Sequence, residues 1–302
     1  MSLQNKCLFF IAILISGMAW SLIPSQHYNI LPEFSIAYRF FLGFSILFSL
    51  SYVKGLIKKL SLRDHLMLCL VGICLYALFC SLSYRATDYL STGLISLFVA
   101  LVVIPNTIFE YCLTRKKISP GFLVQVILTV IGCWMIFMTD PDLEHEHEFI
   151  GVWLSIMAVI IYAIGSRISM QVPHERVSKI YQTALAMLYS AVFSLVMGFL
   201  LSGQVVFPFI WSMNYVIPLI LLGLIFGPIV FVIYLYLVEK VGASMASYIW
   251  VAAPIVALIV SSIFEGLQLT WTVLFGVGLI LFSIVSEKLK IIERAIHYAK
   301  KS

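Results

Sequence analysis

Charged side chains are scarce in this sequence: Asp, Glu, Lys and Arg make up 11% of its 302 residues, whereas hydrophobic residues make up 62%. A soluble domain needs about 25% charged residues to cover its surface. The composition therefore excludes a soluble enzyme or binding domain, and the mean hydropathy of +1.06 is that of an integral membrane protein.

Motifs of catalysis and redox chemistry are missing as well. The six cysteines form no CxxC pair, no GxSxG motif occurs, and no Asp or Glu lies near the middle of an apolar run. An intramembrane enzyme would need paired catalytic groups inside the bilayer. We therefore expect no enzyme activity and no cofactor. A proton relay through a midplane carboxylate has little support, and facilitated exchange or weak coupling stays open.

One segment invites a metal hypothesis. Residues 144–148 alternate glutamates with histidines, and both side chains are zinc ligands. The segment belongs to a short acidic connector without a rigid scaffold, so we interpret it as solvated and expect no metal site.

Ten apolar runs define the fold class. Each is about 17 to 25 residues long, which lets a helix cross a hydrocarbon core about 30 Å thick. Continuous apolar runs without alternation favour helices over a barrel. We predict an all-α integral membrane protein with ten transmembrane helices, near residues 7–25, 34–53, 65–83, 90–113, 120–138, 150–168, 180–201, 214–238, 243–264 and 270–286.

The basic residues are distributed unevenly between the two predicted membrane faces. With a cytoplasmic N-terminus, 17 of the 19 Lys and Arg residues lie on the cytoplasmic side, and only Arg39 and Arg85 do not. By the positive-inside rule both termini are cytoplasmic. These charges are topology signals, so we expect contact with membrane lipids and no nucleic-acid partner. Residues 287–302 are predicted to form a basic amphipathic tail on the cytoplasmic leaflet.

The two halves of the chain repeat one pattern. Gly72 and Gly227 lie 155 residues apart, as do Glu110 and Glu265, and the Ile-Phe-Glu of 108–110 recurs at 263–265. Five spans in each half force the second copy to enter the membrane in the opposite orientation. We predict two inverted five-helix repeats, residues 1–140 and 150–286, which is the usual plan of a secondary transporter.

The stretch from Gly242 to Leu281 resembles the second repeat of an EamA-type permease of the drug/metabolite transporter superfamily. The resemblance depends on small residues at 242, 243, 246 and 247, on Pro254, on Glu265 with Leu-Thr at 269–270, and on glycines in the final helix. Arg39 matches an arginine that is common in the second helix of this family. The resemblance covers essentially the whole chain.

The resemblance implies a permease or exporter of the bacterial inner membrane, the cell membrane, that moves a small organic metabolite by alternating access. Amino acids, compounds similar to S-adenosylmethionine and amphipathic drugs are substrates that the family allows. The alternatives are a lipid or lipid-linked-sugar flippase of the same fold and an intramembrane enzyme. The oligomeric state is left open.

Aromatic and polar side chains inside the apolar spans are the candidates for substrate binding, because the lipid-facing surface needs only apolar side chains. Gln182 and Thr92 belong to a wider set of such residues. The substrate-binding residues that we predict, drawn from both repeats, are Trp20, Arg39, Tyr76, Tyr162, Tyr234 and Trp250.

For three charged residues, both a structural and a functional role are open. Arg39 lies inside its span and needs a partner, either Glu33 or Asp88 on the same side or an acidic group of the substrate. Glu110 and Glu265 lie at span ends, where a carboxylate either bonds loop amides or a helix N-terminus, or takes part in gating.

Helix-breaking residues are concentrated in the eighth and ninth spans. Gly223 and Gly227 form a GxxxG pattern followed by Pro228, and Pro254 lies halfway along the ninth span. The third span has Ile73 where the eighth has Pro228. These four residues are the predicted hinge for alternating access, with packing as the other interpretation, and we expect the second half to bend more.

Overall fold

The computed structural model describes residues 3–114, 120–137, 145–172, 177–241, 246, 248–283 and 285, and every regular element in these ranges is helical. Residues 138–144 of the acidic connector and the tail 287–302 lie outside the described residues, whereas residues 145–148 form the first turn of a helix and not a loop. The helices of the first half are α1 (Leu3–Ser21), η1 (Pro24–Gln26), α2 (Pro32–Val53), α3 (Leu62–Val71), η2 (Gly72–Leu78), α4 (Phe79–Ala86), α5 (Thr92–Ala100), α6 (Val103–Thr114) and α7 (Pro120–Phe137). Those of the second half are α8 (His145–Gln171), α9 (Lys179–Ser202), α10 (Met213–Ile220), η3 (Leu221–Ile229), α11 (Val230–Val241), α13 (Tyr248–Phe264) and the last helix, Trp271–Ser283.

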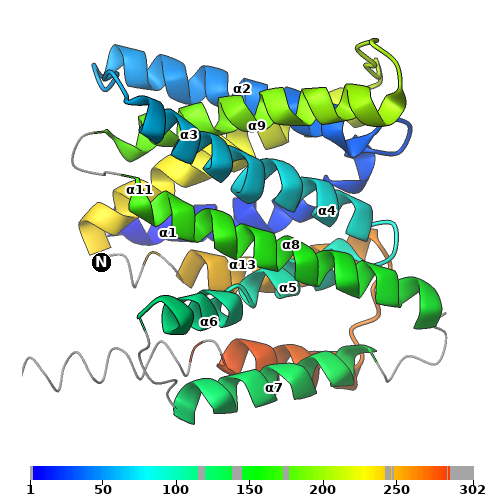
Figure 1. Cartoon of the computed structure of the whole chain (residues 1–302). Coiled ribbons are helices and arrows are strands. Elements are labelled where there is room, and N and C mark those ends of the chain that lie inside the picture. The colour runs from blue at the N-terminus through cyan, green and yellow to red at the C-terminus, as the bar shows by residue number, and fades with distance from the viewer. Residues whose placement is uncertain are drawn as a thin grey trace, which may run out of the picture.

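The helices run roughly side by side (Figure 1), as expected for a bundle that crosses a bilayer. Among the described residues, seven helices are long and apolar enough to span a membrane, and three shorter apolar helices bring the number to ten. The chain is therefore the all-helical membrane protein that the hydropathy predicted. The ends of the helices agree with the ends of the predicted spans to within a few residues.

Local sequence signals set several helix ends. Ser61 and Asp64 form a capping box at the start of α3, in which each side chain accepts a bond from the other residue's backbone N–H. Ser178 caps α9, and Gly203 ends α9 with a φ of 66°, a conformation that glycine adopts without strain. These signals lie at the membrane faces, where the backbone leaves its helix.

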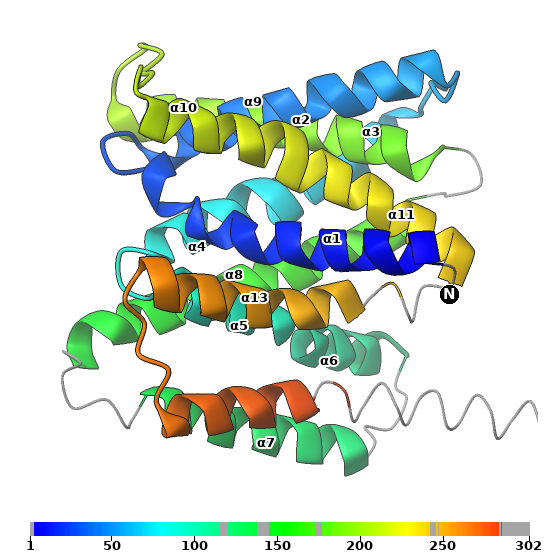
Figure 2. The same cartoon turned by 180° about the vertical axis from the view of Figure 1, so that it is seen from behind.

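Spans of the two halves pack directly against each other. α1 and α5 of the first half contact α13, and α2 contacts α9. α13 and α5 run in opposite directions (Figure 2), as an inverted second copy requires. A Cβ atom added at Gly93 would lie 2.9 Å from the Leu258 backbone, so this glycine permits the close approach of α5 to α13.

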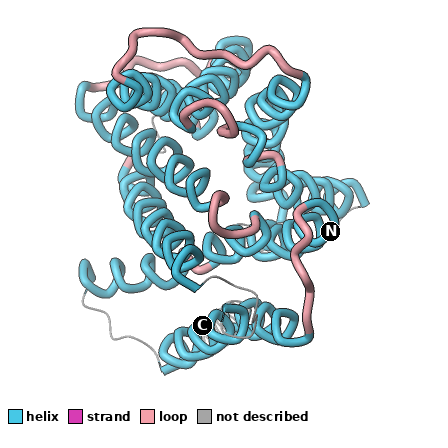
Figure 3. The backbone as a smooth tube through the Cα atoms, turned by 90° about the vertical axis from the view of Figure 1, so that its right-hand side faces the viewer, coloured by secondary structure: helices cyan, strands magenta, loops and turns pink. Residues whose placement is uncertain are grey.

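α7 and the helix Trp271–Ser283 form a pair at the edge of the bundle (Figures 1 and 2), and their apolar side chains share one core cluster with α5 and α13. Gly132 and Gly276 lie at their crossing, where a Cβ atom added to either would come within 2.7 Å of the other's carbonyl oxygen. The hydroxyls of Thr129 and Ser283 are hydrogen-bonded at 3.0 Å. Seen along the helix axes (Figure 3), the pair lies beside the larger group that holds the candidate site.

Three spans depart from regular α-helix. The third contains the π-helix η2 and the eighth the π-helix η3, so a wide turn occurs in both repeats although only η3 contains a proline. The fourth span is broken at residues 101–102, between α5 and α6. Pro105 explains the break, since its ring would clash with the carbonyl of Leu101 in a continuous helix. α13 continues unbroken through Pro254.

Candidate substrate site

A cavity of about 310 Å³ opens between α3 and η2, the end of α8, the start of α9, and α11. Its volume is at the lower end of the range for small-molecule sites, roughly 300 to 1,000 Å³. It holds polar groups among apolar side chains. The lining residues are Leu68, Val71, Leu75, Tyr76, Ser166, Ser169, Met170, Lys179, Gln182, Thr183, Ala186, Phe231, Tyr234 and Leu235. We call the membrane face on this side the Lys179 end and the opposite face the Arg85 end.

Two of the six predicted binding residues line this cavity. Tyr76 comes from η2 in the first repeat, and Tyr234 comes from α11 in the second. The Tyr76 hydroxyl lies close to Thr183, and the Tyr76 ring centroid lies 5.2 Å from that of Phe40. Gln182, one of the wider set of polar span residues, also faces the cavity. The two repeats therefore supply the site together.

Tyr162 lies beside the cavity without lining it. Its ring packs edge-on against Phe79, with centroids 5.1 Å apart, and it is close enough to Tyr76 and Tyr234 to interact with them electrostatically. The three tyrosines form a cluster at the inner end of the cavity. Their hydroxyls and ring faces are groups that bind polar and planar ligands.

Trp250 contacts this cluster, since its ring centroid lies 5.7 Å from that of Tyr234. It is 47% exposed. The lipid-facing stripe of α13 is Ile255, Ile259 and Ile263, and helical geometry places Trp250 on the other side of α13 from this stripe. Its exposed surface therefore does not belong to this stripe, and Trp250 adjoins the cavity only through Tyr234, without lining it.

Arg39 lies in α2, beyond the inner end of the cavity. Its Nη1 donates to the Tyr84 hydroxyl at 3.1 Å, and its guanidinium lies 5.3 Å from the centroid of the Phe40 ring. Its Nε is buried and has no hydrogen-bond partner. Trp20 is partly buried and packs against the cluster of Ile36, Phe40 and Tyr84 and against the neighbouring cluster around Ala86.

The expected pairing of Arg39 with Glu33 or Asp88 is wrong. Glu33 is buried and binds Arg85 instead, with Nη1–Oε1 and Nη2–Oε2 distances of 2.7 and 3.0 Å, and it accepts a bond from Ser81 at 2.7 Å. Asp88 lies 2.9 Å from Nε2 of His27. The prediction used only the depth of each residue in the membrane. Which acid pairs with which arginine also depends on the rotation of α2 and α4 about their axes, and depth does not determine that rotation.

Hydrogen bonds between the two halves add to these contacts at the Arg85 end. Ser35 of α2 bonds the Tyr215 hydroxyl of α10 at 2.8 Å, and the Gln26 amide donates to the Tyr215 carbonyl at 3.0 Å. Together with the pairs Glu33–Arg85 and His27–Asp88, they tie α2, α4 and α10 together. We call this set the Arg85-end contacts.

Glu265 adds a further link between the halves. Its Oε2 accepts bonds from the Thr92 N–H and the Ser261 hydroxyl, both at 2.8 Å, and its Oε1 accepts one from the Thr92 hydroxyl. The carboxylate thus satisfies the N-terminus of α5, where a negative charge is stabilised by the helix dipole. This is the structural role considered for Glu265. The side chain of Glu110 lies outside the described residues.

The predicted hinge residues lie close to the site. Gly223, Gly227 and Pro228 all belong to η3. A Cβ atom added at Gly223 would lie 3.0 Å from the Arg39 carbonyl, so η3 packs against α2 at the residue that carries the guanidinium. Pro254 is buried within α13, one turn after Trp250. The hinge hypothesis concerns motion and stays a prediction.

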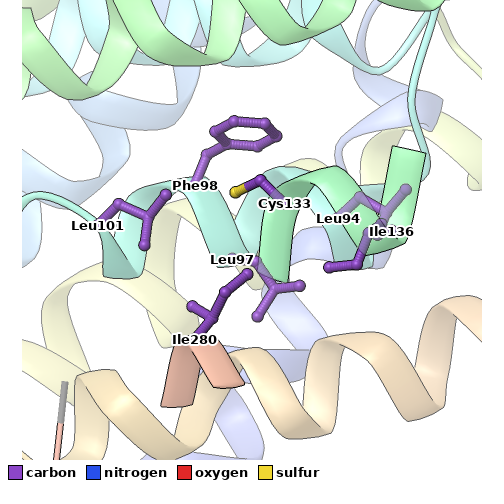
Figure 4. A pocket seen from close by; sticks show the side chains of 7 residues that line it. All are labelled: Leu94, Leu97, Phe98, Leu101, Cys133, Ile136 and Ile280. Atoms are coloured by element: carbon purple, nitrogen blue, oxygen red, sulfur yellow. The ribbon is translucent and has the colours of Figure 1, made fainter. Parts of the chain in front are cut away.

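A second, much smaller gap lies between α5, α7 and the last helix (Figure 4). Its volume is about 10 Å³, room for roughly one water molecule, and the side chains around it are those of Leu94, Leu97, Phe98, Leu101, Cys133, Ile136 and Ile280. The lining offers no strong hydrogen-bonding group, so we interpret the gap as a packing defect.

The fold and the shared cavity define a helical membrane protein whose two repeats build one polar site. The sequence model of the EamA-like transporter family matches residues 6–138 and 149–286, so the chain belongs to this family. It is a membrane transporter and not an enzyme.

Several bacterial proteins are similar over most of their length. An uncharacterized transporter of Clostridium kluyveri is 21% identical over 80% of this chain and 78% of its own. The uncharacterized transporter YvbV of Bacillus subtilis is 26% identical over 76% of this chain and 73% of its own. A solved crystal structure covers 97% of this chain and 98% of its own with a TM-score of 0.61 at 15% identity, which supports the fold.

Proposed function

We propose that this protein moves a small organic metabolite across the bacterial inner membrane by alternating access. The observation that carries the proposal is the contrast between the two ends of the site. At the Lys179 end a cavity of about 310 Å³ reaches the tyrosine cluster, whereas at the Arg85 end ion pairs and hydrogen bonds tie the helices together. Such a contrast is what one state of an alternating-access cycle requires.

The distribution of basic residues supports an orientation with both termini in the cytoplasm. In this orientation the Lys179 end faces the cytoplasm and the structure represents an inward-open state. The two repeats, 1–140 and 150–286, then act as the two halves of the transport unit.

The lining favours a substrate of amino-acid size with a planar or apolar part. Tyr76, Tyr162 and Tyr234 provide ring faces and hydroxyl groups, and Trp250 extends the aromatic surface. Ring faces bind planar groups and also cations. Amino acids and compounds similar to S-adenosylmethionine fit this description.

Conversion to the outward-open state requires the Arg85-end contacts to separate while the walls of the cavity approach each other. Glu33 and Arg85 come from α2 and α4, so their separation moves one helix away from the other. η3 packs directly against α2. A change in the bend of η3 at Gly223, Gly227 and Pro228 would therefore accompany a movement of α2.

Uptake by proteoliposomes tests the proposal. Vesicles with the purified protein are incubated with a defined mixture of amino acids, monocarboxylic acids, their uncharged amides, amines and nucleosides, and their contents are determined by mass spectrometry. We expect selective loading of a small subset. Contents identical to those of protein-free vesicles would contradict a transport function for these compounds.

A further inference from the structure

Arg39 is a cation in neutral surroundings. Its contacts are the Tyr84 hydroxyl and the Phe40 ring, and no carboxylate in the described part of the chain lies within ion-pair distance of it. Arg39 is the eighth residue of α2, which places it about 10 Å inside the span. An unpaired arginine at this depth is strongly unfavourable, and such residues usually mark a substrate pathway.

The acids that could neutralise Arg39 have other partners. Glu33 holds Arg85 through two oxygens, and Asp88 holds His27. The positive charge of Arg39 is therefore available to a ligand. Tyr84 adds a donor, because its oxygen accepts from Arg39 and its own hydrogen remains free to bind an anion.

Cys80 connects this cation to the cavity. It lies one helical turn beyond Tyr76 and is within electrostatic range of Arg39, Tyr76 and Tyr162. Phe40 contacts both the Tyr76 ring and the Arg39 guanidinium. Arg39 does not line the cavity in this state. Through Phe40 it adjoins the tyrosine cluster, and it shares α2 with Glu33 of the Arg85 end, so it lies on the route that we infer for the substrate.

We propose that Arg39 binds the carboxylate of the transported compound, so that the substrates are organic monocarboxylates with the aromatic or apolar body that the tyrosine cluster accepts. A guanidinium binds a carboxylate through two parallel hydrogen bonds and balances its single charge. A phosphate dianion would need a second cation, and Arg85, the arginine of α4, is neutralised by Glu33. This inference depends on the proposed transport function.

The test uses the same vesicles and mixture with three variants. Arg39→Gln should reduce loading of carboxylates about 10- to 100-fold at subsaturating concentration, the effect of losing a hydrogen bond to a charged group. Arg39→Lys, which keeps the charge and loses the planar fork, should retain part of the activity. Arg63→Gln removes an exposed arginine at the start of α3 and should leave loading unchanged.

Melting temperatures separate this role from a structural one. Removing a cation that has no counter-ion should leave the stability of Arg39→Gln unchanged or higher, because the buried charge is lost. Empty wild-type vesicles would contradict both proposals. If the wild type loads compounds without a carboxylate, or if Arg39→Gln loads carboxylates as well as the wild type, transport stands and the carboxylate proposal is overturned.

Discussion

Tyr234 and Trp250 form the aromatic contact that joins α11 to α13 beside the cavity. Trp250 is half-exposed, so its ring has free surface that a substrate can cover. A large aromatic side chain with free surface inside a membrane protein stabilises little by its own packing. We therefore expect its main role to be contact with the substrate during transport.

We expect Trp250→Ala to reduce transport about three- to tenfold, the usual contribution of an aromatic pair beyond its buried area. The amount of protein in the membrane should stay nearly unchanged because little of the indole is packed. The measurements are uptake and protein abundance in the same vesicles. Trp211→Ala, at an 88% exposed position before α10, is the matched control and should transport normally. Equal rates in the two variants would exclude Trp250 from the pathway.

The aromatic candidates for the site could be selected from the sequence, because a lipid-facing surface needs only apolar side chains, and aromatic or polar residues inside a span therefore stand out. The charged pairs could not be predicted in the same way. Glu33, Arg85, His27 and Asp88 form pairs whose members are 52 and 61 residues apart, and the pairing depends on the tertiary register of α2, α4 and the η1 loop. The 155-residue offset between the repeats places Arg85 opposite Lys240, but it does not indicate the partner of Arg85.

At the scale of the helices, hydropathy predicted all ten spans and missed their irregularities. The π-helices η2 and η3 and the break at residues 101–102 change the hydrogen bonding within a span and leave its apolar character unchanged. Pro105 was visible in the sequence, and its effect follows from the clash with the preceding turn. η2 has no proline, so its wide turn has no comparable local signal.

η3 is the helix for which the sequence most clearly predicts bending, because it contains two glycines and a proline. We expect Pro228→Ala to slow turnover several-fold, because alanine restores a backbone donor and stiffens the segment that packs on α2. Substrate affinity should stay the same, since Pro228 does not line the cavity. Transport rate and equilibrium affinity are measured side by side in proteoliposomes.

Pro218→Ala, in the neighbouring α10, is the control for removing a proline from the same span. A wild-type rate in Pro228→Ala, or a loss of affinity with normal turnover, would assign the bend to packing and place the moving element elsewhere.

For the molecule as a whole, the proposed alternating-access cycle assigns to the Arg85-end contacts the stabilisation of the state in this structure. The ion pair of Glu33 with Arg85 brings the guanidinium to both oxygens of a buried carboxylate, one of them through a hydrogen bond, which makes it the strongest single contact of the set. Losing a hydrogen bond between charged groups costs about 1.5 to 3 kcal/mol. In the proposed cycle this pair exists only while the Arg85 end is closed, so we expect its loss to shift the population toward the state open at that end.

Cys80 is a native reporter for this shift. It is buried and lies between Arg39 and Tyr76, and the other five cysteines can be replaced by alanine. In this background a membrane-impermeant thiol reagent added from the periplasmic side should label wild-type Cys80 slowly. Glu33→Gln should raise the labelling rate about 10- to 100-fold, in proportion to the population shift.

Asp64→Asn, which changes a carboxylate at the Lys179 end, is the matched control and should label at the wild-type rate. The result also reports the orientation of the chain. Acceleration from the periplasmic side alone agrees with cytoplasmic termini, whereas acceleration only from the cytoplasmic side would reverse the topology. Equal labelling of Glu33→Gln and wild type from both sides would mean that the Glu33–Arg85 pair does not hold this end closed, and that the hydrogen bonds to Tyr215 and the link through Glu265 carry that role instead.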